Sequence, residues 1–98
     1  MTDSEIPLET HLNAETGQIR WTELERHFAR GVVVRVDPAL DLVAVAAAFV
    51  RDDEAAVMDW MTAGRVWRAV AEDARDWHTR DPELWAVVAA PWVLVQEA

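Results

Sequence analysis

Two arginines in short β-branched segments form the pattern in this sequence that best fits a binding chemistry. Arg35 lies in the segment 32–36 (VVVRV), and Arg68 lies in the segment 65–69 (RVWRA). Such segments favour strands, whose side chains alternate between the two faces. If the strands are neighbours, both guanidinium groups converge on one carboxylate or phosphate, which arginine binds with paired hydrogen bonds. The pattern therefore predicts ligand-binding roles for Arg35 and Arg68.

Two other interpretations of these arginines stay open. The chain has nine basic and eighteen acidic residues, a net charge of −9. Each guanidinium therefore has many carboxylates to pair with, while its aliphatic stem covers the sheet. Alternatively, the pair of arginines works with a carboxylate such as Glu23 or Asp41 in a pocket, as a weak acid–base enzyme.

Other residue types that perform catalysis are sparse. There is no cysteine, which excludes thiolate chemistry and disulfides, and the one serine is Ser4. The histidines, His11, His27 and His78, lack the spacing of a metal site, and the three glycines are isolated, so they form no phosphate-binding loop. We therefore assign no catalytic residue, metal ligand or cofactor, and these absences weigh against an enzyme.

The acidic run 52–54 (DDE) has two interpretations. Its carboxylates could hold a hard cation such as Ca²⁺ or Mg²⁺. Alternatively, Asp53 caps the helix that follows, and the acids suit the positive end of the helix dipole. We favour the cap because the spacing fits a helix start.

Six tryptophans are many for a chain of 98 residues. Each large ring needs a core or an interface to cover it. The periodicity predicts Trp60, Trp77 and Trp85 in the core. Trp67 and Trp92 lie in short strands that can form a sheet edge, so they are the predicted interface residues.

These residues are carried by a succession of short elements. The predicted elements are helices at 7–16, 22–30, 42–51, 54–63 and 71–79, and strands at 32–36, 65–69, 84–89 and 92–96. Thr22 and Glu25 have the spacing of a capping box, and Asp41 is an expected N-cap. Gly31 follows a helix where a left-handed residue is needed. In the helix 54–63, the inner stripe is predicted to be Val57, Trp60 and Met61.

The stretch 84–95 (LWAVVAAPWVLV) contains no charged residue. A segment this apolar must be buried on both faces, and it is shorter than the roughly 20 residues of a membrane-spanning helix. Pro91 has no N–H for a sheet ladder, so it marks a bulge, bend or turn between two strands. We expect this stretch to anchor the sheet.

The acid excess limits the expected partners, and the first residues indicate the expected compartment. A chain of this charge is repelled by nucleic acid and by anionic membrane surfaces, so neither is an expected partner. Residues 1–6 are predicted to be a flexible lead-in without the apolar core of a signal peptide, and the expected compartment is the cytoplasm. Residues 7–98 have the length of a single domain.

Short segments spread over the chain carry a resemblance to a known family. They are WTEL at 21–24, VV at 33–34, LDL at 40–42, Asp52, Trp60, Trp77 and above all PWVLVQ at 91–96. With them the chain resembles a small bacterial family catalogued as domain of unknown function 2288, from about Trp21 to Gln96. The resemblance implies a compact bacterial domain, and it brings no activity, cofactor or catalytic residue to this sequence.

Together these patterns predict a single α+β domain, with about four or five helices packed on a small sheet of about three to four strands. The predicted function is a non-catalytic protein-interaction module that binds itself or another protein, with Trp67 and Trp92 at the interface. The alternative is a small-ligand or anion-binding domain, or a weak acid–base enzyme, that uses Arg35 and Arg68.

Overall fold

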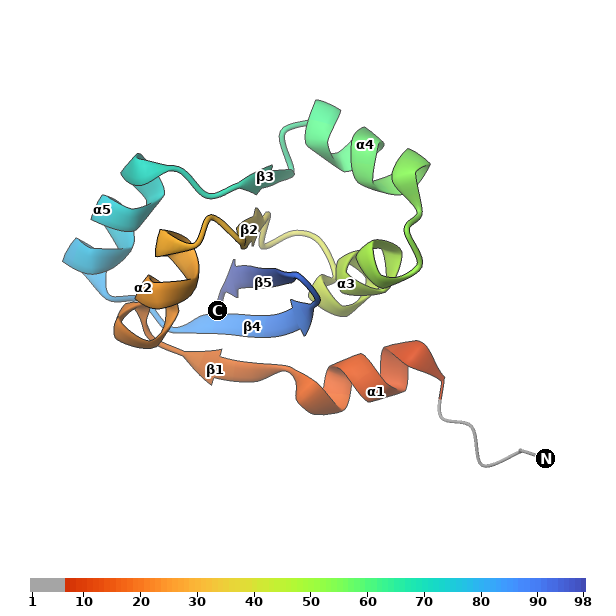
Figure 1. The fold of residues 1–98 in the computed structure, drawn as a ribbon, viewed down its shortest axis with the longest axis horizontal. Coiled ribbons are helices and arrows are strands. Elements are labelled where there is room, and N and C mark those ends of the chain that lie inside the picture. The colour runs from red at the N-terminus through yellow and green to blue at the C-terminus, as the bar shows by residue number, and fades with distance from the viewer. Residues whose placement is uncertain (1–6) are drawn as a thin grey trace.

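The computed structural model describes residues 7–98, so the predicted lead-in at 1–6 lies outside the described residues. Figure 1 shows how helices and strands follow one another along this part of the chain. The helices are α1 (Leu8–Glu15), α2 (Trp21–Ala29), α3 (Leu42–Val50), α4 (Glu54–Thr62) and α5 (Ala71–Arg80). The strands are β1 (Gly17–Ile19), β2 (Val33–Val36), β3 (Val66–Arg68), β4 (Leu84–Ala89) and β5 (Trp92–Glu97).

All five strands belong to one mixed sheet in the order β1-β4-β5-β2-β3. β2 and β5 run parallel, and the other neighbouring pairs are antiparallel. This arrangement confirms the predicted α+β class, but the sheet has one strand more than expected. The additional strand, β1, is three residues long and contains Gly17 and Gln18, so it lacks the alternating apolar pattern that marks a strand in a sequence.

The C-terminal stretch forms a β-hairpin at the centre of the sheet. Ala89 of β4 lies opposite Trp92 of β5, which leaves Ala90 and Pro91 as the turn. The peptide bond between these two residues is cis. β5 lies between β4 and β2, so the apolar stretch anchors the middle of the sheet, as expected. The expected burial on both faces is wrong for β4, where Val88 is 57% exposed.

Helices cover both faces of this sheet, which divides the core in two (Figure 1). We call one side the α3 face. On this side, buried residues of the strands pack with buried residues of α3 and with Leu12 of α1. These strand residues are Val34, Val36, Val66, Val87, Ala89 and Leu94. We call the other side the α5 face. There, the strand residues Val33, Leu84, Val93 and Val95 pack with Trp21 and Leu24 of α2 and with Trp77 of α5.

Of the helices α2 and α3, one begins with its predicted cap and the other does not. Asp41 accepts hydrogen bonds from the N–H groups of Val43 and Ala44, at 3.0 and 3.3 Å, and begins α3 as predicted. The predicted capping box at Thr22 and Glu25 is wrong. α2 begins two residues earlier, with Arg20 as its N-cap and the Arg20 N–H donating to Glu23 at 3.2 Å. Trp21 is therefore helical and buried in the α5 face.

Two of the predicted core positions are wrong. Trp77 is fully buried and Trp60 is half-buried, but Trp85 is 37% exposed. Trp85 lies between Gln18 of β1 and Gln96 of β5, on a part of the sheet where its neighbours are polar. Met61 is 43% exposed, because α4 packs through the half-buried Val57 and Trp60 instead.

Candidate functional site

Arg35 is held in a cage of aromatic and acidic side chains on the α5 face. Its Nη1 donates to Asp73 at 2.7 Å, and its Nη2 donates to Glu97 at 2.9 Å. Its guanidinium carbon lies 5.5 Å from the ring centroid of Trp67 and 5.1 Å from that of Trp77, within the range of cation–π contacts. Two carboxylates thus neutralise the cation, while the rings cover it.

Asp73 is the buried acid of this cage. Besides Arg35, its carboxylate accepts the indole N–H of Trp67 at 3.3 Å and the backbone N–H of Val70 at 2.9 Å. The bond from Val70 satisfies a free donor at the start of α5. Sequence periodicity places Asp73 on the polar side of this helix, but the structure buries it against Arg35 and Trp67.

The ionic network continues from Glu97 to Arg80 and Asp76. Arg80 donates to Glu97 at 2.6 Å and to both carboxylate oxygens of Asp76, at 2.7 and 2.5 Å. The hydrogen bonds that Arg80 donates, first to Asp76 and then to Glu97, raise the pKa of Arg80 above its ordinary value. In turn, the hydrogen bond from Arg80 lowers the pKa of Asp76. The network joins α5 to β5.

Arg68 lies on the opposite face of the sheet from Arg35. In the antiparallel pair of β2 and β3, Arg35 is opposite Trp67, and Arg68 is opposite Val34. Arg68 Nε donates to the Gly31 carbonyl at 2.9 Å. The expected convergence of the two arginines on one ligand is therefore wrong, because the register places them on different faces.

The two carboxylates considered beside these arginines both serve helix starts. Asp41 caps α3, and Glu23 accepts the backbone N–H of Arg20 at the start of α2. Glu23 also lines a hollow of about 280 Å³ between α2 and the strands β1 and β4, together with His27. Neither arginine lines that hollow.

The two tryptophans predicted at an interface are both half-buried. Trp67 is in β3, the edge strand, and its indole N–H is engaged by Asp73. Trp92 begins β5, which is the central strand, so the expectation that Trp92 lies at a sheet edge is wrong. The guanidinium carbon of Arg68 lies 5.5 Å from the ring centroid of Trp92. Trp92 also forms one wall of a pocket.

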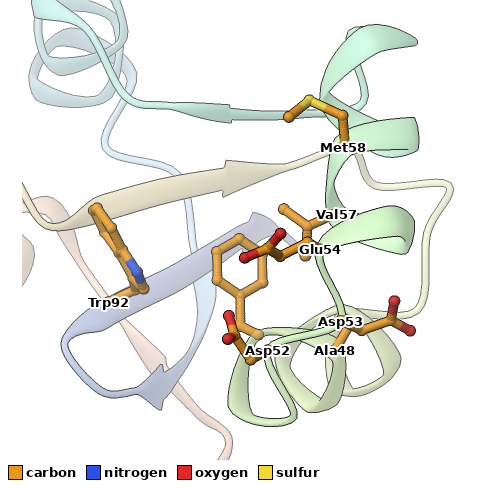
Figure 2. A pocket seen from close by; sticks show the side chains of 8 residues that line it. Ala48, Asp52, Asp53, Glu54, Val57, Met58 and Trp92 are labelled. Carbon is orange, nitrogen blue, oxygen red and sulfur yellow. The ribbon is translucent and has the colours of Figure 1, made fainter.

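This pocket, which we call the Trp92 pocket, lies between the start of β5 and the corner where α3 leads into α4 (Figure 2). Its volume is about 250 Å³. The apolar part of its wall consists of Ala48, Phe49, Val57, Met58 and Trp92. In Figure 2, Val57 and Met58 of α4 extend toward the side where Trp92 stands.

Three acidic residues at the α3–α4 corner complete the lining: Asp52, Asp53 and Glu54. Asp53 accepts the N–H of Ala56 at 3.2 Å, which confirms its predicted role as a cap, and it points away from Trp92 (Figure 2). Asp52 and Glu54 turn their carboxylates toward Trp92 (Figure 2). Within residues 7–98, no hydrogen bond or ion pair engages these two carboxylates.

Across residues 7–98, no three or more histidine, aspartate or glutamate side chains come together in a way that would hold a metal ion. Over the same range, every helix is too short or too polar to cross a membrane.

Comparisons with known proteins identify a family for this chain, but they give no activity. Residues 7–97 match a family model described as a protein of unknown function, DUF2288. Among solved structures, the chain is similar to the NMR solution structure of PA1075 from Pseudomonas aeruginosa. The two are 46% identical with a TM-score of 0.83, and the match covers 99% of this chain and 90% of that chain. No match is found among curated proteins.

Proposed function

This chain belongs to the DUF2288 family, which has no assigned activity, and we propose that it is a non-catalytic protein-interaction module. The observation that carries this proposal is the uncovered apolar surface of α4. None of the nine residues of α4 is buried, although most of them are apolar. Met58 is 61% exposed and Met61 is 43% exposed. We call these two residues, together with the Trp92 pocket, the α4 surface.

The α4 surface has the chemistry of a contact surface. Methionine is flexible and polarizable, so it adapts to different partners, and it is enriched at interfaces. Complete burial of a methionine side chain contributes up to about 1.5–3 kcal/mol relative to full exposure. A partner that covers Met58 and Met61 therefore gains binding free energy from groups that the folded monomer leaves in water.

The roles of the charged residues support the non-catalytic part of the proposal. Arg35 is neutralised by Asp73 and Glu97. Its ion pairs connect β2 to α5 and to β5. Glu23 and Asp41 cap helices. These groups hold elements together, and the two arginines of the alternative hypothesis are separated by the sheet.

Self-association belongs to the same proposal and is supported by the exposed edge of the sheet. The Ala69 N–H donates to the Val33 carbonyl of β2, and the Arg65 carbonyl accepts the N–H of Asp37, directly after β2, so both residues that flank β3 turn these groups toward β2. Since backbone groups alternate in direction along an antiparallel strand, those of Val66 and Arg68 point to the free edge. A second copy that pairs its own β3 there, about a two-fold axis, would cover this edge in both protomers.

Sedimentation velocity over a micromolar concentration range tests the self-association. We expect a concentration-dependent dimer that weakens in Val70→Ser, because Val70 is 52% exposed just beyond β3. Serine is also a favourable residue at this position, the N-cap of α5. A wild-type protein that sediments only as a monomer would contradict dimer formation through β3.

Capture of partners from a native lysate tests the α4 surface. We expect a protein retained by the wild type to be lost with Met58→Glu and kept with Val88→Glu. The two positions are matched, because Met58 and Val88 are 61% and 57% exposed, and Val88 lies on β4 outside the α4 surface. Equal retention by both variants would show that α4 is not the contact surface.

A further inference from the structure

We propose that the Trp92 pocket binds a large apolar side chain of a partner protein, from a segment in which arginine or lysine flanks that side chain. This inference rests on the proposed function and specifies the class of partner that the α4 surface accepts. Three properties of the pocket carry it: its size, its apolar wall and the two carboxylates that face it.

The size of the pocket favours a side chain over a cofactor. A volume of about 250 Å³ is below the roughly 300–1,000 Å³ of pockets that enclose drug-sized ligands. It suits an anchor residue, the kind of large side chain that fills a pocket at the centre of an interface. Trp92 supplies an aromatic surface for this anchor, and Met58 supplies a flexible one.

The charge at the pocket selects the residues beside the anchor. Asp52 and Glu54 turn toward the pocket (Figure 2), and no arginine of the described chain pairs with them. A partner cation at the α3–α4 corner would give each carboxylate a counter-ion. Arg68 belongs to β3 and lies over the ring of Trp92, and it pairs with neither carboxylate. The α3–α4 corner is therefore the negatively charged end of the pocket.

The same charges disfavour a second copy of this chain as the occupant. In a two-fold symmetric dimer the same patch of both copies forms the interface, so the acidic corners of both copies would lie within it. Like charges brought together at this corner oppose pairing of two copies through the pocket. A different protein with a basic and apolar segment has the complementary charge.

Synthetic peptides titrated into the isotope-labelled full-length protein test this inference. The probe is a capped peptide of sequence GRFLRG, compared with GEFLEG and GRSSRG. The readout is the NMR signals of the Met58 methyl group and the Trp92 indole N–H. We expect GRFLRG to shift both signals and to bind more weakly as salt is added, and the other two peptides to bind much more weakly.

A pair of isosteric double variants isolates the role of the two carboxylates. Asp52→Asn with Glu54→Gln removes them and keeps the backbone, because asparagine tolerates the positive φ of 58° at position 52. We expect roughly three- to thirtyfold weaker binding of GRFLRG. The control, Asp59→Asn with Glu72→Gln, removes the same amount of charge from exposed positions outside the pocket and should bind like the wild type.

Any of the following results would overturn the inference. Equal binding of GEFLEG would show that the pocket takes apolar anchors without regard to charge, and the interaction module would stand. Equal binding of GRSSRG, or equal weakening in both double variants, would reveal only general attraction to an acidic protein. If GRFLRG shifted neither signal, the pocket would not take such an anchor, while lysate capture dependent on Met58 would still support the α4 surface.

Discussion

Arg35 shows how one half-buried cation organises several elements. Its guanidinium reaches Asp73 of α5 and Glu97 of β5, and it lies within cation–π range of the rings of Trp67 and Trp77. The side chains of this ion pair are mostly shielded, with 21% of Arg35 and 11% of Asp73 exposed. Loss of either partner therefore leaves a poorly solvated charge, which costs more than the pair itself contributes.

We expect Arg35→Met to lower the free energy of unfolding by about 2–3 kcal/mol, because Asp73 loses its counter-ion while the methionine keeps most of the packing. The midpoint of urea unfolding at an unchanged m-value measures this loss. Arg68→Met is the matched control. Arg68 is exposed and makes one hydrogen bond to Gly31, so its loss should cost below about 1 kcal/mol. Equal costs for the two variants would contradict the structural role of Arg35.

At the scale of elements, the connections between helices and strands depend on a few backbone positions. Gly31 follows α2 with φ of 76°, and Gly64 follows α4 with φ of 75°. Both lead the chain into a strand, β2 or β3. Residues with a Cβ are disfavoured in this conformation.

We expect Gly31→Ala and Gly64→Ala each to lower the free energy of unfolding by about 1–2 kcal/mol, because alanine is strained at these φ values. A Cβ at Gly31 would also lie 3.1 Å from Nη2 of Arg68, whereas at Gly64 no atom lies within 4 Å. Gly31→Ala should therefore cost slightly more, since the end of a flexible side chain must move. Thermal unfolding of both variants measures the difference, and a larger loss for Gly64→Ala would argue against this geometry.

The stability of the folded protein should depend on pH through Asp76, which pairs with Arg80 within α5. The hydrogen bond from Arg80 lowers the pKa of Asp76 in the folded protein below its ordinary value of about 4. The unfolded chain then binds more protons near that pH, so the contribution of Asp76 is present above pH 4 and is lost as the pH falls through the folded pKa.

We expect the free energy of unfolding to fall as the pH is lowered from about 5 to about 2, and to fall less steeply in Asp76→Asn. Urea unfolding at several pH values gives the slope. Glu72→Gln, which removes another exposed carboxyl of α5, is the control and should keep the wild-type slope. An unchanged slope in Asp76→Asn would mean that the ion pair does not form in solution.

At the scale of the whole molecule, β5 is the element that the two halves of the core share. Leu94 belongs to the α3 face, and Val93 and Val95 belong to the α5 face. The strand also joins β4 to β2, and it is the only link between them in the order of the described sheet. The hairpin is therefore needed for both layers of helices to pack.

We expect a chain that ends at Ala90 to lose cooperative unfolding, because it lacks the strand that completes both hydrophobic clusters. Near-ultraviolet circular dichroism and a thermal melt are the measurements, with the full-length protein as the reference. A truncated protein that kept its aromatic dichroism and a sharp transition would contradict the central role of β5.

The sequence alone determined the features that depend on neighbours along the chain. The break between two strands at Pro91, the left-handed Gly31 and the caps at Asp41 and Asp53 were predictable, since the signals are the missing N–H of proline, the permissive φ of glycine and a carboxylate beside free N–H groups. Whether Pro91 lies in a bulge, a bend or a turn was left open by the sequence, and the structure shows the turn of a hairpin.

Only the tertiary structure decided which residues meet across the sheet. The register of β2 and β3 separates Arg35 from Arg68, and the packing of α5 against β2 buries Asp73. The strand β1 and the Trp92 pocket likewise form between segments far apart in the sequence. A shift in register by one residue moves a side chain to the other face, and the pattern of one strand holds no information about its neighbour.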